Sequence, residues 1–445
     1  MDYNNILRIA GYRGETLKNA AIFCRDNGIE EIAELRMKVN KKFGPPNKNP
    51  SLNEVPYNKI IPASGFEPEV YNQMGMAMSI PPALSGALMP DAHPGYSVPI
   101  GGVVLLNGAI SPAFVGVDIA CSVTLALLPI DAKNLEDTKF KEHLLEVLKK
   151  VTHFGPGNAT FGDGVERSAN IIENGSWNIS KEVRKQKEIA QRQLGSSGGG
   201  NHFADIVGVV KSGNPAYLSS VKDSEVIGLM LHSGSRKAGY NIARYYSKLA
   251  DEETAKNHTG IPKGYGWFDI DSTLGREYYF SMLLMERYTL ANHTIIVNRF
   301  SEELGVTPVA NITTVHNIAR YYNTSSVIHR KGAINAAKGM PGVIPGSAGT
   351  FSYLVNGKGN EFSLNSASHG AGRPMSRTKS KALFDEEKFR NSMNGIVHSG
   401  IDKDETPMAY KDINEVMDAQ KDCVEIDAIL MPKVVLMGGK ADDGD

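Results

Sequence analysis

A nine-residue segment around position 369 contains residue types suited to covalent chemistry at phosphorus. His369 stands among small residues, and Arg373 follows four positions later. Because Gly370, Ala371 and Gly372 carry almost no side chain, a polyphosphate can approach the backbone closely. Imidazole is a competent nucleophile, and a guanidinium fork matches phosphate oxygens. The segment predicts a nucleophilic histidine at a phosphate site, although the motif alone also fits a glycine-rich turn around a hydrogen-bonded histidine.

A second group of residues has the chemistry of metal ligands. Asp118 and Cys121 are three positions apart, so one turn can aim both side chains the same way. Three histidines, His202, His232 and His316, stand among small or amide residues. A lone cysteine is usually a small buried hydrophobe. Together, however, these five residues exceed the ligand set of one structural zinc and suit two divalent ions that share the thiolate.

The identity of the metal stays open at this level. Thiolate and imidazole ligands favour zinc, whereas carboxylate and substrate oxygens favour manganese or magnesium. The same motifs also carry basic residues, for which ordinary solvated charge is the alternative to phosphate binding. These cations are Arg236, Arg320, Arg330, Lys331, Arg373 and Arg377.

Composition limits the classes of protein to consider. The 445 residues carry 48 Lys+Arg and 49 Asp+Glu, a net charge of -1, so nucleic acid would be bound by a local patch and not by bulk charge. Three widely spaced cysteines indicate no disulfide framework. The N-terminus lacks a signal-peptide pattern, and no apolar run approaches membrane-spanning length. We therefore expect a cytoplasmic protein with no membrane segment.

The elements that position these residues can be inferred from apolar patterning. Short apolar runs between glycines predict buried strands, and longer stretches with helical spacing predict helices. The predicted strands are 103–106, 123–128, 225–231 and 432–437, with short strands and turns over 305–355; the predicted helices are 136–151, 165–193, 275–304 and 411–421. The polar motifs follow apolar runs, so we expect them to converge beyond the carboxyl ends of strands.

We expect a mixed α/β fold in which layered β-sheets and surrounding helices form one compact catalytic domain over residues 61–445. Two short helices over 15–42 and six prolines between 44 and 68 predict a helical extension and linker over residues 1–60. No internal repeat interrupts this organisation.

Taken in order, nine motifs resemble those of the RtcB family of RNA-splicing ligases. They are MPDAHPGYSVPIGG (89–102), GVDIAC (116–121), LGSSGGGNHF (194–203), HSGSR (232–236), HN (316–317), HRKGA (329–333), IPGSAGT (344–350), SHGAGR (368–373) and AYKDI (409–413). Each motif is weak alone, but nine in the family order are specific. The resemblance runs from about residue 85 to about residue 437.

The resemblance implies a GTP-dependent ligase with two Mn²⁺ ions per active site, acting in RNA repair or tRNA splicing. Such enzymes join an RNA 3′-phosphate or 2′,3′-cyclic phosphate end to a 5′-hydroxyl end, here through a guanylylated His369. The matching motifs put Asp118, Cys121 and His202 around one ion and Cys121, His232 and His316 around the other. The need for an activating protein is left open.

By the same resemblance, a set of residues binds the nucleotide and four cations contact RNA. The nucleotide set is Asn201, Phe203, Asp205, His316, Asn317, Pro345, Gly346, Ser347, His369, Gly370, Ala371, Gly372, Arg373 and Tyr410, the last stacking on guanine; the RNA set is Arg236, Arg320, Arg330 and Lys331. The chain departs from the family pattern at Ser122 (usually Gly), Asp205 (usually Glu) and Met437 (usually Lys, with Lys440 slightly beyond).

The departures at Asp205 and Met437 leave open a ligase with altered nucleotide specificity. The residues are also compatible with a two-metal cyclic phosphodiesterase that does not ligate. The non-enzymatic alternative is an RNA-binding or assembly protein whose fold is stabilised by metal ions.

Overall fold

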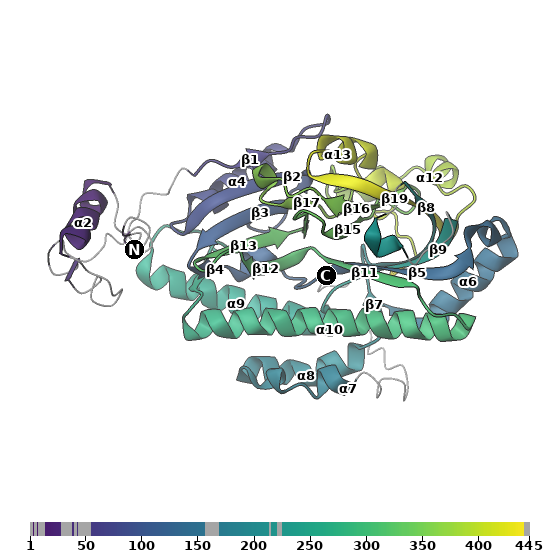
Figure 1. Cartoon of the computed structure of the whole chain (residues 1–445), viewed down its shortest axis with the longest axis horizontal. Coiled ribbons are helices and arrows are strands. Elements are labelled where there is room, and N and C mark those ends of the chain that lie inside the picture. Colours follow the sequence, from purple (N-terminus) through teal and green to yellow (C-terminus); the bar gives the residue numbers. More distant parts are fainter. Residues whose placement is uncertain are drawn as a thin grey trace.

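Two β-sheets form the centre of the molecule in the computed structural model (Figure 1). The structure describes residues 14–27, 55–155, 169–212, 215–219 and 225–439, together with Tyr3, Leu7, Lys38, Val39 and Lys42. The prolines of the expected linker before residue 55, Lys440 and the acidic tail lie outside the described residues. The expected mixed α/β class is confirmed.

The larger sheet contains eight strands, and neighbours along its main path are antiparallel. In spatial order they are β11 (Ala310–Val315), β5 (Ser122–Asp131), β9 (Glu225–Ser233), β8 (Phe203–Lys211), β19 (Val424–Met437), β16 (Ser352–Gly357) and β15 (Pro341–Ile344), with β18 (Val397–Ser399) parallel to β19. The sheet curls so far that its end strands, β11 and β15, meet. A hydrogen bond joins them there, in which the Val343 N–H of β15 donates to Thr314 Oγ1 of β11 at 2.9 Å.

Both faces of this sheet are covered, which explains its continuous apolar runs. On β5, Leu125 and Leu127 belong to one buried cluster, whereas Ala126 and Leu128 belong to another on the opposite face. Successive strand residues point to opposite faces, so an uninterrupted apolar run is what a strand buried on both sides requires.

The smaller sheet has five strands, and three two-stranded sheets accompany it in the described part of the chain. Its order is β1 (Asn58–Lys59), β2 (Ala83–His93), β3 (Ile100–Asn107), β13 (Ser326–Lys331) and β12 (Asn317–Tyr321). The pairs are β4 (Ala109–Ile110) with β10 (Phe268–Asp269), β14 (Ala333–Asn335) with β17 (Ser366–Ser368), and β6 (His153–Phe154) with β7 (Ser196–Gly198).

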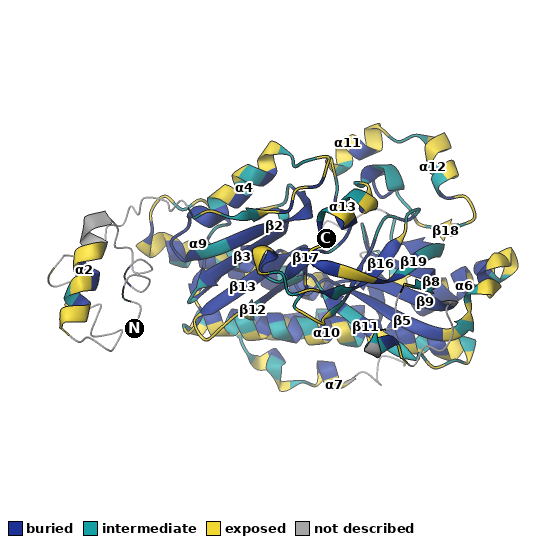
Figure 2. Ribbon diagram, turned by 45° about the horizontal axis from the view of Figure 1, so that its top comes forward, coloured by how far each residue is buried: buried dark blue, intermediate teal, exposed yellow. Residues whose placement is uncertain are grey.

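Helices cover the outer faces of the sheets. Most residues of the strands are buried (Figure 2). Within the described ranges, the α-helices are α2 (Gly14–Asp26), α4 (Pro68–Ser79), α5 (Pro112–Val115), α6 (Thr138–Val151), α7 (Ala169–Ile172), α8 (Lys181–Gln193), α9 (Arg236–Asn257), α10 (Thr273–Leu304), α11 (Arg377–Ala382), α12 (Glu386–Ser392) and α13 (Ile413–Ala419). Short 3-10 turns are η1 (Ala132–Glu136), η3 (Gly175–Asn178), η4 (Ala216–Leu218), η5 (Glu361–Ser363) and η6 (Pro407–Ala409).

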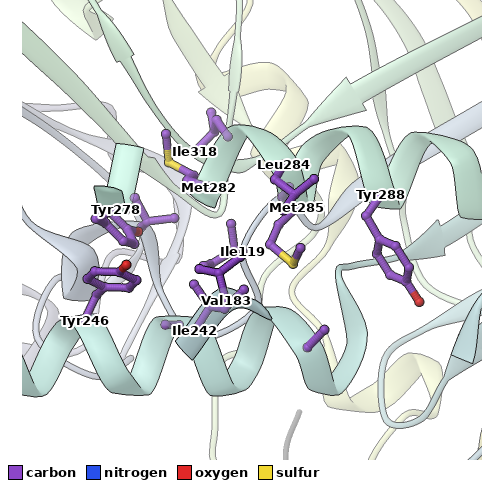
Figure 3. Packing of buried hydrophobic residues seen from close by; sticks show 14 of the residues in the cluster. Ile119, Val183, Ile242, Tyr246, Tyr278, Met282, Leu284, Met285, Tyr288 and Ile318 are labelled. Carbon is purple, nitrogen blue, oxygen red and sulfur yellow. The ribbon is translucent and has the colours of Figure 1, made fainter. Parts of the chain in front are cut away.

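Helix α10 is 32 residues long and runs beneath the sheets (Figure 1). Ser272 caps its start by accepting the Gly275 N–H at 3.0 Å, and Gly305 ends it in the left-handed region with φ 65°. Figure 3 shows Met285 and other apolar side chains of α10 packing toward Ile242 of α9. This packing fixes the helix against the rest of the core.

Most of the predicted elements are confirmed. The runs 103–106, 123–128 and 225–231 lie in β3, β5 and β9, and helices α6, α10 and α13 occupy the stretches predicted as helical. The helix predicted over 165–193 is confirmed in part, because α7 and α8 lie within it but the 3-10 turn η3 separates them in the described part. Helix α9 was not predicted, nor was the short helix α5 that precedes Asp118.

The N-terminal residues that are described form a buried cluster of their own, made by Leu7, Ala20, Ala21, Cys24 and Val39. Pairing with the smaller sheet begins at β1, and the division of the chain at residue 60 stays a prediction. Among the described residues, no helix combines the length and apolar character needed to cross a membrane.

Two substitutions on α10 test the packing. Met285 is fully buried and Leu290 is 50% exposed on the same helix. We expect Met285→Ala to lower the free energy of unfolding by about 2–5 kcal/mol through lost burial and a residual cavity, and Leu290→Ala to change it by less than about 1 kcal/mol. Chemical denaturation measures both. Equal losses would contradict the packing described here.

Candidate active site

The five predicted metal ligands converge at one end of the larger sheet. Cys121 immediately precedes β5, His202 immediately precedes β8, His232 lies near the end of β9, and His316 follows β11. Neighbouring strands are antiparallel, so the start of one strand lies beside the end of the next. The register confirms this, since Ser122 pairs with both Ser233 and Val315.

This arrangement corrects one expectation from the sequence. Only His232 and His316 lie at carboxyl ends of strands, whereas Cys121 and His202 lie at amino ends. Gathering of ligands at carboxyl ends is a property of parallel sheets. In an antiparallel sheet, ligands come from alternating strand ends instead. The predicted ligands still lie close together at one end of the sheet.

The ligand atoms form two triads that share one sulfur. Cys121 Sγ lies 3.2 Å from His232 Nε2, which is 3.3 Å from His316 Nε2. The same sulfur lies 3.6 Å from His202 Nε2, which is 3.2 Å from Asp118 Oδ2. Within each triad all ligand atoms are within 4.8 Å of one another. Two adjacent cation positions with a common thiolate fit this geometry.

A tight loop aims Asp118 and Cys121 inward. The Cys121 N–H donates to the Asp118 carbonyl at 3.3 Å, and Ala120 between them adopts a left-handed φ of 58°. Asn317 supports the loop because its Nδ2 donates to the Asp118 carbonyl at 2.9 Å. Gly234 packs so closely that a Cβ there would lie 1.9 Å from Asp118 Oδ1. Strained backbone of this kind is typical of functional sites.

Electrostatics favour the metal-binding protonation states of His232, His316 and Asp118. Burial, helped by neighbouring imidazoles, lowers the pKa of His232 and His316 well below the ordinary value. For Asp118, burial alone would raise the pKa, but the hydrogen bond and charge of His202 reverse this and lower it. Neutral His232 and His316 and an ionised Asp118 present lone pairs, so these donors fit divalent ions.

His369 lies directly beside this cluster. Its ring centroid is 4.9 Å from that of His316. Its Nδ1 is 2.7 Å from Asp91 Oδ2, and its backbone N–H donates to the same oxygen at 3.1 Å. Asp91 is fully buried. A carboxylate on Nδ1 favours the Nδ1–H tautomer, which leaves the lone pair on Nε2.

A cavity of 670 Å³ connects the cluster, His369 and the glycine-rich segment. Among the predicted site residues, those that line it are Asp118, Cys121, Asn201, His202, Phe203, Asp205, His232, His316, Asn317, Lys331, Pro345, Gly346, Ser347, His369, Gly370, Ala371, Gly372, Arg373 and Tyr410. The volume is in the range of small-molecule sites. Arg236, Arg320 and Arg330 do not contribute to its lining.

The four cations predicted to contact RNA lie in different surroundings. Arg330 is buried, and its Nε donates to Ser366 Oγ at 2.9 Å. Lys331 is also buried, its Nζ donates to the Val98 carbonyl at 2.8 Å, and burial lowers its pKa to about 7. Arg236 is buried as well, whereas the partly exposed Arg320 pairs with Glu286. Contact with RNA stays a prediction for all four, and the burial of three of them disfavours surface contact.

A buried carboxylate, Glu405, ties two pocket residues together. Its Oε1 accepts from Arg373 Nη1 at 3.1 Å, and its Oε2 accepts from the Tyr410 hydroxyl. It also pairs with Arg377, which lines the cavity. No sequence pattern assigned a role to Glu405 or Asp91. Asp91 stands inside the motif over 89–102, but no spacing signal connects either acid to its partner.

Asp205 lies in an apolar part of the pocket. It pairs across the sheet with Met230 on one side and Val435 on the other, and Met437 lies two residues beyond on β19. Its Oδ1 accepts the Leu436 N–H at 3.3 Å. Burial raises the pKa of Asp205 well above the ordinary value, which favours the neutral acid.

Comparison with known proteins agrees with this geometry. The sequence pattern of the family described as "tRNA-splicing ligase RtcB" matches residues 73–438. The chain belongs to the RtcB family. It is 32% identical to "RNA-splicing ligase RtcB" of Escherichia coli (strain K12) over 392 residues, which cover 79% of this chain and 90% of that protein. It is therefore an RNA-ligase-family enzyme, as the motifs predicted.

Two further RtcB-family relatives are more distant. "tRNA-splicing ligase RtcB" of Methanococcus maripaludis is 29% identical over 438 residues, covering 82% of this chain and 90% of that protein. "RNA-splicing ligase RtcB" of Mycobacterium tuberculosis is 28% identical over 398 residues, covering 74% of this chain and 91% of that protein. Each comparison extends over most of both chains.

The raised pKa of Asp205 gives a testable pH dependence. The unfolded carboxyl ionises near pH 3.9, but the folded one stays protonated to higher pH, so Asp205 destabilises the fold increasingly as pH rises from about 4. We expect the free energy of unfolding of Asp205→Asn, relative to the unsubstituted protein, to increase between about pH 4 and pH 7. Denaturant titrations at several pH values measure it. Exposed Asp422→Asn is the control, and a pH-independent difference for Asp205→Asn would contradict the assignment.

Proposed function

We propose that this protein is a GTP- and Mn²⁺-dependent RNA ligase that joins a 3′-phosphate or 2′,3′-cyclic phosphate end to a 5′-hydroxyl end. The observation that carries the proposal is the position of His369, whose ring is 4.9 Å from His316 of the metal-ligand cluster while Asp91 holds Nδ1. An oriented imidazole beside a place for two cations suits nucleophilic attack on a nucleotide phosphate.

In the first step, Nε2 of His369 attacks the α-phosphorus of GTP. An N–P bond forms, the bond from the α-phosphorus to the bridging oxygen breaks, and pyrophosphate leaves. The product is a GMP phosphoramidate on His369. Asp91 contributes by fixing the ring and by stabilising the positive charge that develops on the imidazole as Nε2 bonds to phosphorus.

The metal residues would be Asp118, Cys121 and His202 for one ion and Cys121, His232 and His316 for the other. Bound divalent ions supply Lewis acidity that neutralises charge on phosphate oxygens.

The pocket residues around His369 would bind the nucleotide. Arg373, held by Glu405, would bind phosphate oxygens through its remaining N–H groups. Tyr410, tied to the same carboxylate, would stack on the base. Asn201 would donate to a phosphate oxygen.

The next two steps transfer the nucleotide and seal the strand. An oxygen of the RNA 3′-phosphate attacks the phosphorus on His369, the N–P bond breaks, and a diphosphate-linked guanosine caps the RNA end. The 5′-hydroxyl then attacks the RNA phosphorus, its proton is lost, and GMP leaves. A 2′,3′-cyclic phosphate is first opened by water to the 3′-phosphate. Positioning and charge neutralisation supply most of the catalysis in reactions of this type.

Labelling with GTP carrying a radioactive α-phosphate tests the nucleophile. In the presence of Mn²⁺, we expect covalent label on the unsubstituted protein and none on His369→Ala. Exposed His143→Ala controls for loss of a histidine elsewhere. Label retained on His369→Ala at the level of the control would rule out this nucleophile. A panel of divalent ions in the same assay identifies the metal.

Product analysis distinguishes ligation from hydrolysis and from binding alone. With a nicked RNA that carries a 2′,3′-cyclic phosphate and a 5′-hydroxyl, we expect joined strands in the presence of GTP and Mn²⁺. A 3′-phosphate without joining would indicate a cyclic phosphodiesterase. Metal binding without any turnover, together with loss of stability on chelation, would indicate a binding or assembly protein.

The surroundings of Asp205 favour weaker discrimination for guanine. A neutral carboxyl both donates and accepts a hydrogen bond, and the neighbouring Met437 offers no charged donor. We expect unlabelled ATP to compete with labelled GTP to within about tenfold of unlabelled GTP itself, the effect of roughly one hydrogen bond. Strict preference for GTP would contradict this.

A further inference from the structure

Two consecutive polar residues lie in the middle of α10, behind the metal-ligand cluster. Asn292 and His293 are both fully buried, and neither lines the cavity. They interrupt an apolar helix surface that packs against the sheet. Burial of a polar side chain is costly unless its hydrogen bonds are satisfied. The partners of these two residues therefore indicate what they do.

His293 connects three strands. Its Nδ1 is 2.8 Å from Thr124 Oγ1 on β5, and its Nε2 is 2.8 Å from Ser233 Oγ on β9. Thr124 in turn lies 2.8 Å from Thr313 Oγ1 on β11. Burial lowers the pKa of His293 to about 3, so the ring is neutral, with one donor and one acceptor for the two hydroxyls.

Asn292 holds a fourth segment. Its Oδ1 accepts the backbone N–H groups of Gly195 at 2.6 Å and Ser196 at 3.1 Å, and its Nδ2 donates to the Ser196 carbonyl at 2.8 Å. The same Nδ2 lies 3.4 Å from Ser233 Oγ. The amide thus pairs with the backbone at the beginning of the glycine-rich turn that leads to His202.

The four segments are those that carry the shared cysteine and the three histidines. Thr124 is three residues after Cys121, Thr313 three before His316, Ser233 one after His232, and Ser196 six before His202. Two neighbouring side chains on one helix therefore join all four segments. We propose that Asn292 and His293 are positioning residues that hold these ligands at the spacing of the metal pair. This inference rests on the proposed metal centre.

The physical reason is the precision that metal ligation demands. Residues that orient ligands from behind change metal affinity by roughly 10–100-fold when they are removed. A strand can slide or tilt by a fraction of an ångström with little loss of its own hydrogen bonds, but such a shift separates ligand atoms that must meet around one ion. Hydrogen bonds from a rigid helix to several strands restrict that movement.

The test measures metal affinity without activity. Co²⁺ is titrated into metal-free protein, and the thiolate-to-cobalt absorption reports binding at Cys121. The variants are His293→Leu, which removes both hydrogen bonds, and His293→Gln, which can retain one. His329→Gln is the matched control, because His329 is also buried with a pKa lowered by burial to about 4, and its Nε2 accepts the Ser111 N–H at 3.0 Å. Thermal unfolding of each metal-free variant measures stability separately.

We expect His293→Leu to bind Co²⁺ at least tenfold more weakly than the unsubstituted protein, with His293→Gln intermediate and His329→Gln within a factor of two. Should His293→Leu fail to fold, His293→Gln decides. Unchanged Co²⁺ affinity in the His293 variants that fold would overturn the positioning role while leaving the proposed function intact. Failure of the unsubstituted protein to bind Co²⁺ would overturn both, and affinity losses equal to that of His329→Gln would assign the effect to general destabilisation.

Discussion

A single sulfur atom imposes the main constraint on this structure. Cys121 Sγ stands 3.2 Å from one histidine nitrogen and 3.6 Å from another, and it belongs to both ligand triads. Removing polar groups from water is unfavourable unless they gain partners. The cluster of buried imidazoles and thiol, with the partly buried carboxylate of Asp118, is therefore stable only in a frame that fixes every strand end around it. The antiparallel order β11-β5-β9-β8 supplies that frame, because it brings alternating strand ends to the same place.

His369 comes from outside this sheet. His369 follows β17, which pairs with β14, and β14 continues directly from β13 of the smaller sheet. Gly332 in that connection leaves so little room that a Cβ would lie 3.1 Å from the His369 ring. The candidate active site thus lies where the two large sheets and the β14–β17 pair meet. The larger sheet carries the ligand cluster, β2 of the smaller sheet carries Asp91, and β17 leads into His369.

Much of this could be predicted from residue types. Strands buried on both faces gave continuous apolar runs, α10 gave a long helical pattern, and Cys121 with the motif histidines indicated a shared metal centre. What could not be predicted depends on contacts between residues far apart in the chain. Asp91 reaches His369 across 278 positions, and the connections of His293 to Thr124 and Ser233 span 169 and 60. The antiparallel strand order likewise depends on long-range pairing that no local sequence pattern encodes. Helix α9 begins at Arg236, whose left-handed backbone conformation cannot be recognised from the sequence as a helix start.

The most direct test of the account is a crystal structure of the protein with Mn²⁺, using anomalous scattering at the manganese absorption edge. We expect two anomalous peaks on either side of Cys121 Sγ, one within bonding distance of Asp118 and His202 and the other within bonding distance of His232 and His316. A single peak, or two peaks that do not share the sulfur, would contradict the claim that one thiolate organises the site.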